Sequence, residues 1–138
     1  MDFSGLNIWE LVVASLSTFV VGFFWYGNLL FGRKWQKLAG LNEEELAKGN
    51  MGLIYGTAFV LNFVLAFFLS IFTEIAMMLG TSALMAGLFA VLICLGLVAT
   101  TFGVNFLFSR KPMKLYLIDV GYMIVSFFIM GIIIGAWH

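Results

Sequence analysis

Charge is scarce in this sequence, because 10% of its 138 residues are Asp, Glu, Lys or Arg while 63% are hydrophobic. Soluble domains carry roughly 25% charged residues, and a fold of this length exposes much of its chain to solvent. The shortage excludes an ordinary soluble domain and indicates a chain whose solvent is lipid. Seven basic residues balance seven acidic ones, so no excess of positive charge points to nucleic acid as a partner.

Histidine and cysteine occur once each, as His138 and Cys94. One cysteine excludes a disulfide within the chain, and one histidine excludes a bis-histidine haem site. A nucleophilic triad needs a His or Lys base beside Ser or Cys, and no lysine lies deep in an apolar run. We therefore expect no catalytic residue, no cofactor and no enzyme activity. Glu10, Glu74 and His138 are the remaining candidates for a metal site, and we expect none there.

Four apolar runs are long enough to cross a bilayer, which takes roughly 20 helical residues. Their interiors lack proline, since the one proline, Pro112, stands where the fourth helix should begin. Backbone groups in lipid must pair within their own segment, so the runs are predicted to be helices. The predicted spans are residues 8–30, 53–78, 83–108 and 113–137. The expected fold class is an all-α membrane protein, one four-transmembrane-helix bundle over residues 1–138.

The basic residues lie on one side of the predicted spans, in or beside the first and third loops. They are Arg33, Lys34, Lys37, Lys48, Arg110, Lys111 and Lys114. The positive-inside rule makes that side cytoplasmic. We therefore expect a multi-pass protein of a bacterial inner membrane, with both termini outside the cytoplasm. Within the cytoplasmic loop 31–50, Asn42 and Glu45 have the spacing of a capping box, which predicts a short surface helix over 43–48.

Two segments at the cytoplasmic ends of the helices are alike. Residues 28–38 and 105–115 share seven of eleven positions, including Asn28 and Asn105. The identity is compatible with a duplicated two-helix hairpin, which would give parallel repeats. The alternative is that any inner membrane boundary gathers Phe, Arg and Lys.

Polar and small residues recur at helical spacing inside the apolar runs and form one stripe on each predicted helix. The stripes are Ser15, Thr18 and Gly22 on the first helix; Tyr55, Asn62, Ala66, Ser70 and Thr73 on the second; Thr101 and Asn105 on the third; and Tyr116, Asp119, Tyr122 and Ser126 on the fourth. An ionisable side chain at a helix centre costs roughly 2.5–3.5 kcal/mol in the bilayer and is a functional candidate by default. If the polar stripes of all four helices face inward, Asn28, Asn105 and Asp119 lie together near the cytoplasmic side of the bundle. Asn62 then lies near the midplane, and the outer end is closed by Glu10 and Glu74. The predicted binding residues are Trp25, Tyr26, Asn28, Asn62, Glu74, Asn105, Asp119 and Tyr122.

Two interpretations of these polar stripes are open. They form a pathway or pocket for a proton, a cation or a small polar solute, or they form hydrogen bonds that hold the helices together. Such bonds stabilise membrane helices by roughly 0.6–2 kcal/mol each. Small-xxx-small motifs beginning at Gly52, Ala83 and Gly131 favour close helix packing, within the bundle or between protomers of a homo-oligomer.

Three motifs resemble a known family. The first runs from Gly22 through Trp25-Tyr26 and Phe31-Gly32 to Trp35, the second is Leu95-Gly96 through Thr101, and the third is Asp119-Val-Gly121-Tyr122. In this order, and over nearly the whole chain, they resemble an uncharacterised bacterial membrane-protein family, domain of unknown function 1761. Cys94 stands where family members often have Trp. The resemblance implies the four-span fold and assigns no activity.

Two functions are expected from these observations. The first is an oligomeric protein, surrounded by membrane lipid, that binds or conducts a small solute or ion through a polar interior near Asp119. The alternative is a structural or regulatory membrane subunit whose cytoplasmic loop 31–50 docks a partner or lipid. A cavity that reaches Asp119 favours the first, and a sealed bundle with an ordered loop favours the second.

A cysteine introduced into the first loop tests the orientation. We expect Lys37→Cys to stay unlabelled when an impermeant thiol reagent is added outside intact cells, because loop 31–50 lies in the cytoplasm. Labelling from outside would show that the orientation is inverted.

Overall fold

The computed structural model describes residues 5–138, and in this range it contains helices and turns but no strand. The helices are α1 (Ile8–Trp25), α2 (Gly32–Ala39), α3 (Glu43–Ala47), α4 (Met51–Met78), α5 (Ala83–Ile93), α6 (Thr100–Phe108) and α7 (Met113–Trp137). A π-helical segment, η2 (Cys94–Ala99), joins α5 to α6 without a break. Four of the described helices are long and apolar enough to span a membrane: α1, α4, the continuous helix Ala83–Phe108, and α7. The all-α four-helix class is confirmed, and the chain is a multi-pass membrane protein.

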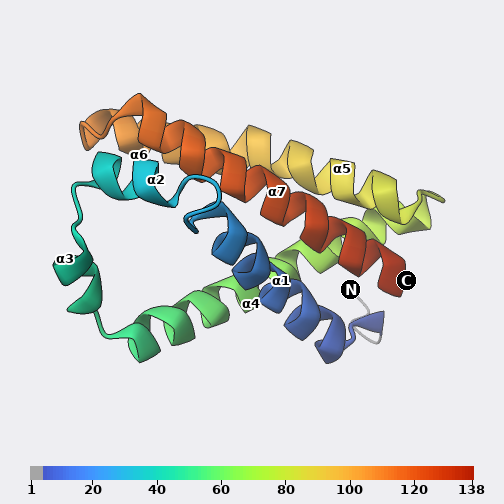
Figure 1. Cartoon of the computed structure of the whole chain (residues 1–138). Coiled ribbons are helices and arrows are strands. Elements are labelled where there is room, and N and C mark those ends of the chain that lie inside the picture. Colours follow the sequence, from blue (N-terminus) through green and yellow to red (C-terminus); the bar gives the residue numbers. More distant parts are fainter. Residues whose placement is uncertain (1–4) are drawn as a thin grey trace.

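Helix α7 lies at the centre of the arrangement, where it contacts α1, α4 and the long helix made of α5, η2 and α6. Figure 1 shows α7 running beside the long helix made of α5, η2 and α6, with α1 against the other side of α7. Helix α4 packs near both termini and then diverges from α1 and α7 toward α3. The bundle is therefore closed at the end that holds the termini and open at the end that holds α2 and α3.

Small residues bring α5 and α7 into close contact. A Cβ atom added to Gly131 would lie 2.8 Å from Ala86 O and 2.8 Å from Ala90 Cβ, and one added to Gly135 would lie 2.8 Å from Ala86 Cβ. The small-xxx-small motifs beginning at Ala83 and Gly131 therefore face each other within one chain, as close membrane helices require. The third motif differs, because no atom lies within 4 Å of a Cβ added to Gly56.

The stripes predicted on α1 and α4 face inward only in part, because Tyr55 at the start of the α4 stripe is 58% exposed. Ser15, Thr18, Ser70 and Thr73 are at most 1% exposed. Ser15 Oγ donates to Leu11 O at 2.6 Å, Thr18 Oγ1 donates to Ser15 O at 2.7 Å, and Ser70 Oγ donates to Phe67 O at 2.7 Å. These three hydroxyls bond within their own helices, so they fill buried space without linking one helix to another.

The stripe predicted on the third span is wrong, and the π-helical segment explains why. Buried positions step by four residues from Ala90 to Cys94 and then by five to Ala99. A π turn inserts an extra residue, which rotates everything that follows it around the helix axis. Phe106 consequently packs inward, while Thr101 and Asn105 are exposed.

The first span ends earlier than predicted, at Trp25, because the chain turns sharply between α1 and α2. Phe31 N donates to Trp25 O at 3.0 Å and Gly32 N donates to Gly27 O at 3.0 Å. A Cβ atom on Gly32 would lie 2.5 Å from Tyr26 O, so the turn requires glycine at this position. Residues 28–31 thus form a turn where the similar residues 105–108 are helical. The duplicated hairpin stays a prediction that this local difference does not favour.

The predicted loop 31–50 contains more helix than expected. The surface helix is confirmed as α3, and Asn42 Oδ1 accepts a hydrogen bond from Glu45 N at 2.7 Å. Helix α2 was not predicted. Its basic residues Arg33, Lys34 and Lys37 are exposed, and Trp35 and Gln36 are half-buried. Eight residues are too few for a clear period in the sequence, and the helix is stabilised by its contact with α7.

Substitution of two helical glycines tests the close contact between α5 and α7. We expect Gly131→Ala to lower the free energy of unfolding by roughly 1–3 kcal/mol, because the added methyl group overpacks the interface. Reversible unfolding in mixed micelles measures the change. Gly56→Ala is the matched control, and the open space around it predicts no loss. Equal destabilisation by both substitutions would contradict the close contact.

Candidate functional site

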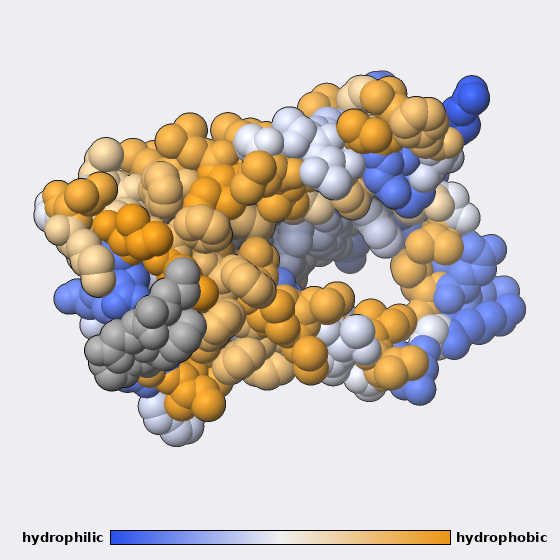
Figure 2. Space-filling view, turned by 180° about the vertical axis from the view of Figure 1, so that it is seen from behind, coloured by the Kyte–Doolittle hydropathy of each residue, from blue (hydrophilic) through white to orange (hydrophobic). Residues whose placement is uncertain are grey.

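Two adjoining cavities occupy the open end of the bundle. The inner cavity, of about 780 Å³, is lined by α1, α2, α4, α6 and α7 and by the chain around α3. Its walls include Tyr26, Asn28, Trp35, Gln36, Glu45, Tyr55, Phe102, Asp119, Tyr122 and Met123. The lateral cavity, of about 890 Å³, lies between α1 and α4 and includes Thr18, Phe19, Gly22, Phe23, Ile54, Ala58 and Asn62. Figure 2 shows an opening through this end of the molecule, between the hydrophobic body and the hydrophilic end.

Asp119 is the acidic residue of the inner cavity that lies on a spanning helix, and it is held by Tyr26 at the end of α1. Its Oδ1 atom accepts a hydrogen bond of 2.7 Å from the Tyr26 hydroxyl. The Tyr26 ring lies 5.2 Å from the Tyr122 ring and 5.6 Å from the Trp35 ring, measured between centroids. A half-buried carboxylate thus lies among three aromatic side chains that come from three different elements.

Two aromatic side chains near this bond, Trp25 and Tyr122, also join α1 to α7. The Trp25 indole donates to Ile118 O at 2.9 Å, and the Tyr122 hydroxyl donates to Thr18 O at 3.2 Å. Gly121 makes room for Trp25, because a Cβ atom there would lie 2.6 Å from Cζ2 of the indole. We call Trp25, Tyr26, Asp119 and Tyr122 the inner cluster.

The predicted site residues fall into three groups. Trp25, Tyr26, Asp119 and Tyr122 come together as the inner cluster, and Asn28 and Asn62 line the cavities beside it. Asn105 does not join them. It is exposed on α6, where its Oδ1 accepts a long bond of 3.4 Å from Ser109 Oγ.

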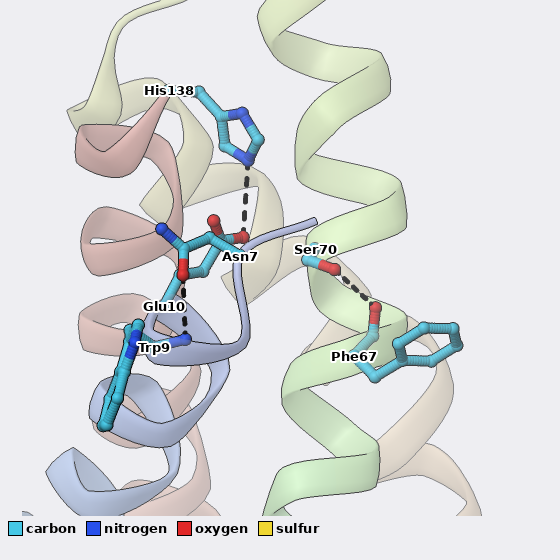
Figure 3. Close-up of polar contacts among 6 residues, drawn as sticks. All are labelled: Asn7, Trp9, Glu10, Phe67, Ser70 and His138. Atoms are coloured by element: carbon cyan, nitrogen blue, oxygen red, sulfur yellow. Dashed lines mark hydrogen bonds and ion pairs between the residues drawn. The ribbon is translucent and has the colours of Figure 1, made fainter. Parts of the chain in front are cut away.

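Glu74 lies in the third group, at the opposite end of the molecule. There Glu10 is fully buried, with Oε1 3.3 Å from His138 Nε2 and Oε2 without a hydrogen-bond partner. Figure 3 shows the His138 ring extending from the end of α7 toward Glu10 at the start of α1. Among residues 5–138, no group of three His, Cys, Asp or Glu side chains is arranged to hold a metal ion.

An apolar core separates these two ends. It contains Leu11, Ala66, Leu69, Phe127 and Met130, each at most 5% exposed. These residues lie between the outer acids and the inner cavities along α1, α4 and α7. The acidic residues therefore form two separate groups. The buried hydroxyls of Ser15, Thr18 and Ser70 bond to carbonyl groups of their own helices and do not link these groups.

Several cavity residues were missing from the predicted site. Trp35 and Gln36 reach the inner cavity from α2, Tyr55 from α4 and Phe102 from α6. A signal existed for Tyr55, which begins the polar stripe of α4, and for Trp35, which belongs to the first family motif. The sequence held no such signal for Phe102, because the direction in which this side chain points depends on the π-helical segment.

The site's chemistry suits binding. The described walls of the inner cavity hold two carboxylates, amide groups and aromatic rings, and include neither His, Cys nor Lys. A nucleophile with an adjacent base is therefore lacking in these walls, whereas the rings and the carboxylate offer surfaces for a ligand.

One family model matches the chain. Its description is "Protein of unknown function (DUF1761)", and the match covers residues 9–135, which includes all four spans and every residue of the inner cluster. No curated protein and no solved structure matches the chain.

A double-mutant cycle tests the link between Tyr26 and Asp119. We expect Tyr26→Phe to lower the free energy of unfolding by roughly 0.5–2 kcal/mol, because Asp119 loses its hydrogen-bond donor. Its effect should largely disappear when Asp119→Leu is already present, because leucine has no atom that accepts the hydrogen bond. Tyr116→Phe is the control, because that hydroxyl donates to Ala99 O at 2.7 Å instead. Additive effects of Tyr26→Phe and Asp119→Leu would show that the two side chains do not interact.

Proposed function

We propose that the chain, which belongs to the family described as Protein of unknown function (DUF1761), is a membrane protein without enzyme activity that binds a small solute or ion in the inner cavity. One observation carries this proposal: the Asp119 carboxylate, within a membrane-spanning helix, lines a cavity of about 780 Å³. Ligand sites in proteins have volumes of roughly 300–1,000 Å³. An acidic residue within a span is costly and marks a functional site by default.

The alternative to a ligand site is that Asp119 only holds helices together. Helix packing alone explains the bond between Tyr26 and Asp119, but it does not explain a cavity beside that bond. In a bundle built only for packing, the carboxylate would be enclosed by helices, as Ser70 and Thr73 are. The half-buried position of Asp119, open to the cavity, favours a ligand.

Conduction is the second step of the proposal. The apolar core closes the outer half of the bundle, so a bound solute reaches the other side only if this core opens. Helix α4 is the element most able to move, because its first half diverges from α1 and α7 (Figure 1). Exposed apolar side chains on that half, Leu53, Val60 and Leu61, face lipid or a second copy of the chain in an oligomer.

The orientation follows from the basic residues. Helices α2 and α3 and the turn before α7 lie at the same end of the molecule, and the loops at this end carry Lys and Arg. The positive-inside rule then gives an inner cavity that opens toward the cytoplasm of a bacterial inner membrane, with both termini outside.

A second candidate function is the docking of a partner or lipid through residues 31–50. The specific observation in its favour is α2, which exposes Arg33, Lys34 and Lys37 while Trp35 packs toward α7. Basic side chains beside a membrane-spanning helix attract anionic lipid headgroups, by about 1 kcal/mol for each residue near the surface.

Ion flux in proteoliposomes tests the first function. We expect proton or monovalent-cation flux from the native protein, and a fall to the level of protein-free liposomes for Asp119→Asn, because the binding carboxylate is lost. Glu74→Gln is the matched control, since it removes a carboxylate from the opposite end of the bundle. Equal flux from the native protein and Asp119→Asn would contradict a role for Asp119. Absence of flux from both, together with absence of any solute binding that depends on Asp119, would contradict the function itself.

A further inference from the structure

The charged groups in the cavity walls are all negative. Asp119 on α7 and Glu45 on α3 are the two charged side chains that line the inner cavity, and the lateral cavity has none among its described walls. The seven Lys and Arg residues of the chain all lie outside these walls. Lys111 is close enough to act on the charge of Asp119 but is not part of the walls. A bound anion would therefore face carboxylates directly, whereas a cation would be attracted.

Aromatic side chains make up a large part of the inner wall. Tyr26, Trp35, Tyr55, Phe102 and Tyr122 all line it. The Tyr26 ring is tilted by 69° to the Trp35 ring and by 55° to the Tyr122 ring. Rings at such angles present both faces and edges to a shared space, and aromatic faces attract cations within about 6 Å of the ring centroid.

A bare divalent metal cation fits these walls poorly. Alkaline-earth ions need roughly six or more oxygen ligands to replace their water. In these walls, Oδ1 of Asp119 already accepts a hydrogen bond from the Tyr26 hydroxyl. A cation whose charge is covered by alkyl or aryl groups has little water to lose, and its apolar groups can lie against Phe, Tyr and Trp.

The adjoining lateral cavity provides room for such groups. It shares Tyr26, Asn28, Ile54, Tyr55 and Tyr122 with the inner cavity, and its own walls are mostly apolar, with Phe19, Phe23 and Ala58 among them. A ligand with a charged centre near Asp119 can therefore extend its apolar part between α1 and α4.

We propose that the ligand of the inner cavity is a lipophilic organic cation, with a tertiary or quaternary ammonium or similar onium centre. The proposal rests on the proposed function and names the substrate class of the same site. The onium centre lies among Asp119, Tyr26, Tyr122 and Trp35, and its apolar substituents occupy the lateral cavity. Two sources supply this chemistry: a free organic cation, and the choline headgroup of a lipid that enters between α1 and α4.

Equilibrium dialysis of tetraphenylphosphonium against the purified full chain in detergent is the experiment. Tetraphenylborate is the matched probe, because it has nearly the same size and shape with a negative charge. We expect saturable binding of the phosphonium ion. Asp119→Asn and Trp35→Leu should each weaken it about tenfold, as loss of a desolvated cation contact does. Trp35→Phe keeps an aromatic face and Glu74→Gln leaves the cavity unchanged, so both should bind nearly as the native protein does.

The two variants at position 35 keep the test independent of folding. Both remove the same indole and leave an apolar side chain, so a difference between them reports the aromatic face and not the stability of α2. Equal binding by Trp35→Phe and Trp35→Leu would overturn the aromatic role.

The borate probe decides the role of charge. Binding of tetraphenylborate as tight as that of tetraphenylphosphonium, unaffected by Asp119→Asn, would overturn the proposal and show an apolar cavity without charge selection. Absence of phosphonium binding alongside ion flux that depends on Asp119 would also overturn it, while the proposed function would stand.

Nanodiscs distinguish the two sources of the cation. In discs of phosphatidylglycerol, added phosphatidylcholine should displace the phosphonium probe if the headgroup is the ligand, and should leave it bound if a free cation is. Either result supports an onium site, provided that Asp119→Asn removes the probe binding.

Discussion

The attachment of the end of α1 to α7 is the contact on which the open half of the molecule depends. Three hydrogen bonds make it, from Trp25 to Ile118 O, from Tyr26 to Asp119 and from Tyr122 to Thr18 O. Each joins residues about a hundred positions apart in the chain. Because α1 turns directly into α2 at Gly32, the same contact also sets where Trp35 lies. Without it, neither the aromatic walls nor the Asp119 carboxylate would have a defined place.

The two halves of the bundle are stabilised in different ways. In the outer half, Gly131 and Gly135 of α7 lie against Ala86 and Ala90 of α5, and backbones approach closely. Dispersion between closely packed atoms drives this association, since lipid removes the usual hydrophobic force. In the inner half, aromatic side chains and one carboxylate hold α1 on α7 while α4 diverges. A dense outer half and a hollow inner half together give a cavity that is closed at one end.

Buried polar groups have unequal meaning in this protein. The hydroxyls of Ser15, Thr18 and Ser70 bond to carbonyl groups of their own helices and leave nothing for a ligand. One oxygen of the Asp119 carboxylate accepts a hydrogen bond from Tyr26, and the carboxylate lines a cavity. The distinction between packing and binding thus rests on where the remaining hydrogen-bonding capacity points, which residue type alone does not reveal.

What the sequence determined by itself is the depth of each residue in the membrane. Apolar runs of about 20 residues define the spans, and counting along them brings Trp25, Tyr26, Asp119 and Tyr122 to one level. All four were among the predicted binding residues, although the cluster predicted at this level was Asn28, Asn105 and Asp119. Helix α3 was also predicted from the sequence, because the Asn42 cap at its start is a local interaction. Only the tertiary structure decided which way each residue faces around its helix. Asn105 lies near the level of Asp119 but faces away, since the π-helical segment Cys94–Ala99 shifts the phase of all that follows. Trp35 reaches the cavity because α2 folds back onto α7, and the cavity exists because α4 diverges. The depth of a residue in the membrane follows from its position along a helix. The direction in which it points around the helix axis depends on contacts with other helices, which no local pattern encodes.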